Sequence, residues 1–126
     1  MMSTASTAST ASSAIFIPEE LMFTGDPTRD AIIRKFIEIL QTPPLLVNHD
    51  TYDEELKTRA AYLAVGLEEA LNGKFKNDGK GYNDKARSLL FNLRDVKNPE
   101  LRNRLIIGDL MPYDLANLDA KHLASD

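Results

Sequence analysis

The chain has 126 residues and a mass of 14.1 kDa, and its 43% apolar content suits one domain with one core but leaves no room for a second, catalytic domain. The net charge of −4 and the pI of about 5.2 argue against a protein that coats nucleic acid, so any basic surface must be local. The lack of cysteine excludes disulfides and thiolate zinc sites, and no apolar run is long enough to span a bilayer.

The first 24 residues differ in composition from the rest of the chain. Residues 1–14 are nearly all Ser, Thr and Ala, so they bury too little apolar surface to offset the entropy of ordering, and we expect them to be disordered. They also lack the basic start and long apolar run of a signal peptide. Residues 15–23 contain an apolar patch of Ile15, Phe16, Ile17, Leu21, Met22 and Phe23, which either docks on the domain or binds a partner. We therefore expect a tail over residues 1–24 and a helical domain over residues 25–126.

The domain is predicted to begin with a helix over residues 27–41. Asp26 is a typical N-cap, and Pro27 suits the first helical turn, where its missing N–H costs nothing. Pro43 and Pro44 require the helix to end before them. One face of this helix is apolar, and it carries Ile32, Ile33, Phe36, Ile37 and Leu40.

A second helix is predicted over residues 51–72. Thr51 and Glu54 have the spacing of a capping box, and Asn72-Gly73 is a typical helix stop. Apolar residues recur every three or four positions between these signals, at Leu56, Ala60, Leu63, Leu67 and Leu71. This spacing places Leu67 in the middle of a core-facing stripe.

A third long helix is predicted over residues 81–95, after a polar loop over residues 74–81. Its apolar face carries Tyr82, Ala86, Leu89, Leu90 and Leu93. The same spacing leaves Lys85, Arg87 and Arg94 largely outside that face.

Short helices are predicted from Asn98 onward. Asn98 is a typical N-cap with Pro99 at the first turn, Gly108 can end a helix in the left-handed conformation, and Pro112 can open another. No strand-like alternation of useful length occurs anywhere in the sequence. The predicted fold class is therefore all-α, a bundle of three longer helices with two or three short C-terminal helices.

The residues that could suggest catalysis or metal binding have simpler explanations. Glu68 and Glu69 are adjacent on a helix, so they point in different directions, and we interpret them as solvated or as buried and paired structural carboxylates. His49 and His122 are far apart and cannot assemble the usual zinc geometries. We predict no catalytic residue, no metal site and no cofactor in this chain.

One cluster of residues has a charge opposite to that of the whole chain. These basic residues could steer an acidic partner onto one helical face, or they could form an ordinary solvated surface, because Asp84 and Asp95 lie among them. The candidate binding residues are Lys80, Lys85, Arg87, Arg94, Lys97, Arg102 and Arg104.

The second half of the chain resembles a known family. The residues that carry the resemblance are, in order, Tyr82, Lys85, Arg87-Ser88, Asn92-Leu93-Arg94-Asp95, Lys97-Asn98-Pro99, Leu101-Arg102, Gly108-Asp109, Pro112, Leu115-Ala116 and Leu123-Ala124-Ser125. Upstream it continues at Thr28-Arg29-Asp30 and Leu67-Glu68-Glu69-Ala70-Leu71. This order resembles the central domain of the RNA polymerase II elongation factor TFIIS, a domain that also occurs in PHD-finger transcription regulators.

The resemblance implies a nuclear, monomeric module that binds RNA polymerase II without being an enzyme. In that family the equivalent basic helix contacts the largest polymerase subunit, and the position of Glu68 usually holds a glutamate that is part of the fold. Transcript cleavage and the release of arrested polymerase depend on a C-terminal zinc ribbon outside this chain. We expect no association with a membrane and no strong direct binding to nucleic acid.

Two other functions remain open at this point. The chain could be the TFIIS-like domain of a PHD-finger regulator, which binds polymerase without stimulating cleavage. It could also be a generic helical interaction domain that uses residues 15–23 as its binding segment.

Overall fold

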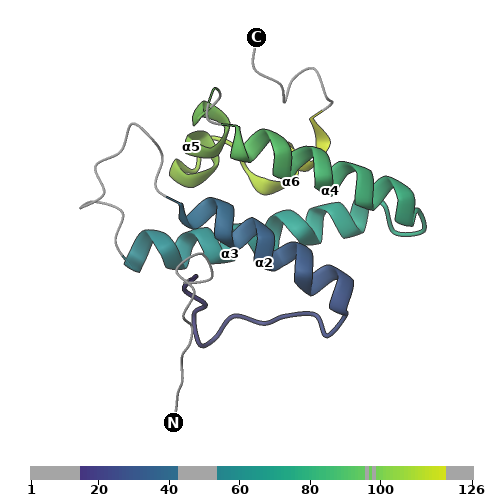
Figure 1. The fold of residues 1–126 in the computed structure, drawn as a ribbon, viewed down its shortest axis with the longest axis horizontal. Coiled ribbons are helices and arrows are strands. Elements are labelled where there is room, and N and C mark those ends of the chain that lie inside the picture. The colour runs from purple at the N-terminus through teal and green to yellow at the C-terminus, as the bar shows by residue number, and fades with distance from the viewer. Residues whose placement is uncertain (1–14, 43–53, 96, 98, 119–126) are drawn as a thin grey trace.

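The computed structural model describes residues 15–42, 54–95, 97 and 99–118, and these residues form five helices and no strand (Figure 1). The helices are α2 (Pro27–Gln41), α3 (Glu54–Lys74), α4 (Gly79–Arg94), α5 (Pro99–Ile107) and α6 (Pro112–Asn117). Helix α3 is central, because it contacts each of the other four. The predicted all-α fold, with three longer helices and short C-terminal ones, is confirmed.

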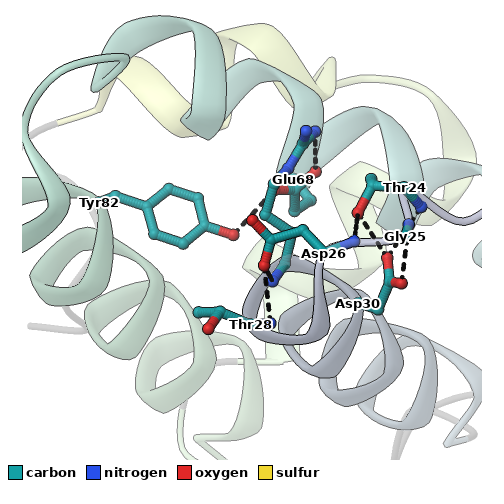
Figure 2. Close-up of polar contacts among 8 residues, drawn as sticks. Thr24, Gly25, Asp26, Thr28, Asp30, Glu68 and Tyr82 are labelled. Carbon is teal, nitrogen blue, oxygen red and sulfur yellow. Dashed lines mark hydrogen bonds and ion pairs between the residues drawn. The ribbon is translucent and has the colours of Figure 1, made fainter.

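Helix α2 has the predicted bounds, because local signals define its start. The Asp26 carboxylate accepts hydrogen bonds from the backbone N–H groups of Thr28 and Arg29, and Pro27 follows the cap. The preceding turn is fixed by Asp30, whose carboxylate accepts from the N–H groups of Thr24 and Gly25 and from the Thr24 hydroxyl (Figure 2). These bonds, above all the one from the Thr24 N–H, lower the pKa of Asp30.

The predicted stop of α3 at Asn72-Gly73 is wrong. The helix continues to Lys74, since the N–H of Phe75 still bonds to the Leu71 carbonyl and the Phe75 ring packs against the core. Those contacts outweigh the cost of a helical glycine, about 1 kcal/mol. The Thr51 half of the predicted capping box lies outside the described residues.

The predicted loop over residues 74–81 is also too long, because α4 begins at Gly79. Asp78 caps this helix by accepting from the N–H of Gly81 at 2.9 Å. Gly81 must lack a side chain there, since a Cβ atom would lie 2.7 Å from the Phe75 ring. The short turn between α3 and α4 therefore depends on local packing that the glycine-rich sequence does not reveal.

The signals predicted for the C-terminal helices are confirmed where the structure describes them. Gly108 ends α5 with φ of +91°, in the left-handed region, and Pro112 occupies the first turn of α6. Arg59 of α3 donates from Nε to the Ile106 carbonyl at 2.7 Å, so its positive charge lies at the C-terminal end of α5. The predicted cap Asn98 lies outside the described residues.

The core runs through all five helices. The predicted apolar face of α4 is entirely buried, and Leu67 lies fully buried on α3. On the predicted apolar faces of α2 and α3, three residues are only half-buried, namely Ile32, Leu56 and Leu63. The largest fully buried apolar side chains are Ile33, Phe36, Ile37, Leu40, Leu67, Leu71, Leu89, Leu93, Leu105 and Leu115.

The apolar segment of residues 15–23 docks on the helices, as one of its two interpretations predicted. Leu21 is buried in the core, and Ile15, Ile17 and Phe23 pack against it. The side-chain amide of Gln41 accepts from the N–H of Phe16 and donates to its carbonyl, at 2.7 and 2.6 Å. In Figure 1 this segment lies beside α2, on the side away from α4 and α5. The expected tail of residues 1–14 lies outside the described residues.

Candidate functional site

Helix α4 presents one exposed stripe along its length. Lys80, Asp84, Arg87, Phe91 and Arg94 recur every three or four residues, so they share one side of the helix, and all five are exposed. We call these five residues the α4 outer face. The opposite side of the same helix is buried. Side chains of the outer face can therefore change without entering the core.

The charges in the N-terminal half of the α4 outer face are paired with one another. The Lys80 ammonium lies 2.8 Å from the Asp84 carboxylate, and the Arg87 guanidinium lies 3.7 Å from it. The hydrogen bond between Lys80 and Asp84 raises the pKa of Lys80 and lowers that of Asp84. One carboxylate is thus shared between two cations, which leaves this half with a net charge of about +1.

The charge in the C-terminal half is not paired in this way. Within the described residues Arg94 makes no ion pair, and it follows the exposed ring of Phe91 by three positions. Arg94, Phe91 and Asp95 line a shallow hollow of about 200 Å³. The Asp95 carboxylate accepts from the backbone N–H of Lys97, an exposed residue just beyond the helix.

Lys85 and Arg102 do not lie on the exposed surface that the sequence predicted for them. Lys85 is half-buried, and its ammonium donates to the Leu118 carbonyl at the end of α6. Arg102 is buried on α5. Both side chains therefore present less exposed charge than the residues of the α4 outer face.

Arg104 is exposed, but it is engaged within its own helix end. Its guanidinium lies 2.9 Å from the Asp109 carboxylate, just beyond the left-handed Gly108. This ion pair joins α5 to the turn that precedes α6, so Arg104 contributes to that turn and is not part of the α4 outer face. Five of the seven candidates remain exposed, and three of them lie on the α4 outer face.

Glu68 proves to be a buried and paired carboxylate. It accepts from Nε and Nη2 of Arg29, at 2.7 and 2.9 Å, and from the Tyr82 hydroxyl at 2.8 Å. Figure 2 shows the Tyr82 hydroxyl pointing at Glu68. Because Arg29 is on α2, Glu68 on α3 and Tyr82 on α4, this buried polar cluster joins the three longer helices.

The electrostatics of this cluster follow from its burial. Burial and the hydrogen bond to Glu68 raise the pKa of the Tyr82 hydroxyl, so it stays protonated and donates. The same carboxylate raises the pKa of Arg29. All three groups are engaged with one another, and Glu68 and Tyr82 are buried. The cluster is therefore suited to fixing helix positions, and solvent has little access to Glu68.

Sequence reasoning missed one residue of this surface. Phe91 directly follows Leu90 of the buried side, yet the residue is 69% exposed. The signal was the spacing of residues 80, 84, 87, 91 and 94, which places Phe91 on the charged side of the helix.

The described residues include neither a group of side chains suited to metal binding nor a helix suited to spanning a membrane. Among them, no group of three or more histidine or acidic side chains could hold a metal ion. Nor does any helix in this part of the chain have the length and apolar character needed to cross a membrane.

Comparison with known proteins places the chain in a family. The family model described as the central domain of transcription factor S-II (TFIIS) matches residues 24–126. The chain is 35% identical over 104 residues to the transcription elongation factor TFIIS of Arabidopsis thaliana, and 30% identical over 103 residues to transcription elongation factor A protein 3 of Mus musculus. These matches cover 81% and 82% of this chain but only 27% and 28% of those proteins.

The chain is also similar to a protein that is not named as an elongation factor. Over 76 residues, the chain is 36% identical to human PHD finger protein 3, a match that covers 58% of this chain and 4% of that protein. The solution structure of the TFIIS domain II of that protein superposes with a TM-score of 0.64 at 25% identity, and the match covers 84% of this chain and 85% of that one.

Proposed function

Because this chain belongs to the family of TFIIS central domains, we propose that it is a non-catalytic module that docks on RNA polymerase II, as part of a nuclear transcription elongation factor. Two relatives are named transcription elongation factors, which supports a role in elongation. The chain spans about a quarter of their length. What it contributes is therefore the docking step and not the whole activity of such a factor.

The observation that carries this proposal is the α4 outer face. It concentrates positive charge in a chain whose net charge is −4, and its helix is anchored by a fully buried opposite side. Exposed charges of this kind accelerate encounter with an acidic partner and set its orientation more than they add affinity. We infer that the partner surface belongs to the largest polymerase subunit, as the family resemblance implies.

The docked domain would hold neighbouring parts of the full-length protein near the polymerase. In an elongation factor that neighbour is a zinc ribbon, outside this chain, which promotes transcript cleavage and the release of arrested polymerase. The similarity to human PHD finger protein 3 supports a second candidate, a regulator that docks without stimulating cleavage. A transcript-cleavage assay on arrested polymerase with the full-length protein separates the two.

The test of docking is a titration of purified RNA polymerase II on the immobilised chain by biolayer interferometry. The variant Arg87→Glu/Arg94→Glu reverses two exposed charges of the α4 outer face. Lys85 is left unchanged because its bond to the Leu118 carbonyl supports the fold. A matched control, Lys35→Glu/Lys76→Glu, makes the same change in net charge at exposed positions on α2 and in the loop before α4.

We expect the outer-face variant to bind about tenfold more weakly, a loss of about 1.4 kcal/mol, and the control to bind like the parent. Binding of the parent should weaken as salt rises, because exposed charges are screened beyond a Debye length of about 8 Å at physiological ionic strength. Circular dichroism checks that both variants stay folded. If the folded outer-face variant binds polymerase as tightly as the parent, this face is an ordinary solvated surface.

A further inference from the structure

The C-terminal half of the α4 outer face combines an exposed aromatic ring with a cation. Phe91 exposes 69% of its surface. It lies on the side of α4 opposite the buried apolar residues. A single exposed apolar side chain is ordinary on a soluble protein and would carry no inference alone. Here it lies beside Arg94 at a hollow of about 200 Å³ that both residues line.

The distribution of charge separates this half from the rest of the helix. Lys80 and Arg87 share the Asp84 carboxylate, so a partner must compete with an existing ion pair there. Arg94 makes no ion pair within the described residues, and the Asp95 carboxylate that lines the same hollow accepts from the Lys97 N–H, so an incoming carboxylate reaches Arg94 without displacing an ion pair. Aromatic residues and arginine are also the types most enriched at the centre of protein interfaces.

The hollow suits a side chain better than a small molecule. Its volume, about 200 Å³, is below the 300–1,000 Å³ typical of ligand pockets, and it is shallow. An apolar side chain that covers the Phe91 ring would remove it from water, while a neighbouring carboxylate could pair with Arg94.

We propose that Phe91 and Arg94 are the anchor of the docking interface, and that they bind an acidic protein segment that presents an apolar side chain next to a carboxylate. This inference rests on the proposed function and assigns that segment to the polymerase surface. Lys80 and Arg87 then contribute mainly to the rate of encounter, whereas Phe91 supplies affinity through apolar contact. The two contributions respond differently to salt, which makes them separable by experiment.

The experiment compares Phe91→Ala with the matched control Tyr113→Ala in the same interferometry titration of purified RNA polymerase II. Tyr113 is an aromatic residue of nearly the same exposure, 71%, on α6. Both side chains are largely in solvent, so we expect both variants to keep the parent's circular dichroism. Phe91→Ala should raise Kd about tenfold and leave the salt dependence of Kd unchanged, because the lost contact is apolar. Tyr113→Ala should bind like the parent.

Three results would overturn the proposal, and each identifies what failed. If the parent binds polymerase and Phe91→Ala binds equally well, the anchor is wrong but the docking function stands. If the parent itself does not bind, the docking function fails and the anchor with it. If the parent binds single-stranded RNA more tightly than polymerase and Phe91→Ala loses that binding, the ring is a platform for base stacking.

Discussion

The substitution Glu68→Gln tests whether the buried polar cluster holds the three longer helices together. Glutamine keeps the shape of the side chain and one acceptor oxygen, but it removes the charge and replaces the second oxygen with a donor. The carboxylate of Glu68 receives two bonds from Arg29 and one from the Tyr82 hydroxyl. The variant therefore loses at least one charge-assisted bond, and the Arg29 guanidinium loses its buried counter-ion.

The size of the effect follows from the burial of the two partners. A hydrogen bond to a charged group contributes about 1.5–3 kcal/mol, and breaking a fully buried ion pair costs about 3–5 kcal/mol. The cost of about 3–5 kcal/mol for a fully buried pair does not apply in full, because only Glu68 is fully buried. The Arg29 side chain is 25% exposed, so water can replace part of the hydrogen bonding that its guanidinium loses. We expect Glu68→Gln to lower the free energy of unfolding by about 2–3 kcal/mol.

The assay is urea denaturation followed by circular dichroism, with Glu69→Gln as the matched control. Glu69 is the next residue on the same helix and is exposed, so its substitution should change stability by less than about 0.5 kcal/mol. A Glu68→Gln variant as stable as the Glu69→Gln control would refute the reasoning, because it would show that the cluster adds no net stability to the fold.

Three further substitutions or deletions test other parts of the fold. Leu67→Ala should cost about 2–5 kcal/mol in urea denaturation, because it leaves a cavity at a fully buried site, and a cost below about 0.5 kcal/mol would place that face outside the core. Since burial raises the pKa of Tyr82, the folded chain keeps a proton that the unfolded chain loses near pH 10, so stability falls as pH rises above about 10. The stability difference between the parent and Tyr82→Phe should shrink there, and a constant difference from pH 8 to 11 would contradict this. A chain that begins at residue 24 should melt at a lower temperature than one that begins at residue 15, because it lacks Leu21 and the bonds of Gln41 to Phe16; equal melting temperatures would contradict the docking.

The parts of the fold that could be predicted from sequence are those with local causes. Asp26 and Pro27 define the start of α2 within two residues, and Gly108 needs only its own backbone freedom to end α5. Gly73 misled the prediction because the end of α3 is decided by the packing of Phe75, which is a tertiary contact. Local signals thus predicted the helices well and the turn between α3 and α4 poorly.

The candidate site was harder to predict for the same reason. Periodicity identified α4 and its buried side, but the burial of Arg102 and the bond of Lys85 to the Leu118 carbonyl depend on how α5 and α6 pack. Similarly, Arg29 lies 39 residues from Glu68 in sequence, so nothing near Glu68 in the chain indicates its partner. Phe91 differs from these residues, because it is not among the predicted site residues although the spacing of the charged residues already indicates its place on the outer face.

Photo-crosslinking from single positions tests most directly which surface docks on the polymerase. A photoreactive phenylalanine analogue at position 91 is compared with the same analogue at position 113, where the native aromatic residue has nearly the same exposure but lies on α6. We predict that the probe at position 91 crosslinks to the largest subunit of purified RNA polymerase II and that the probe at position 113 does not. Crosslinking from position 113 and not from position 91 would contradict docking through the α4 outer face.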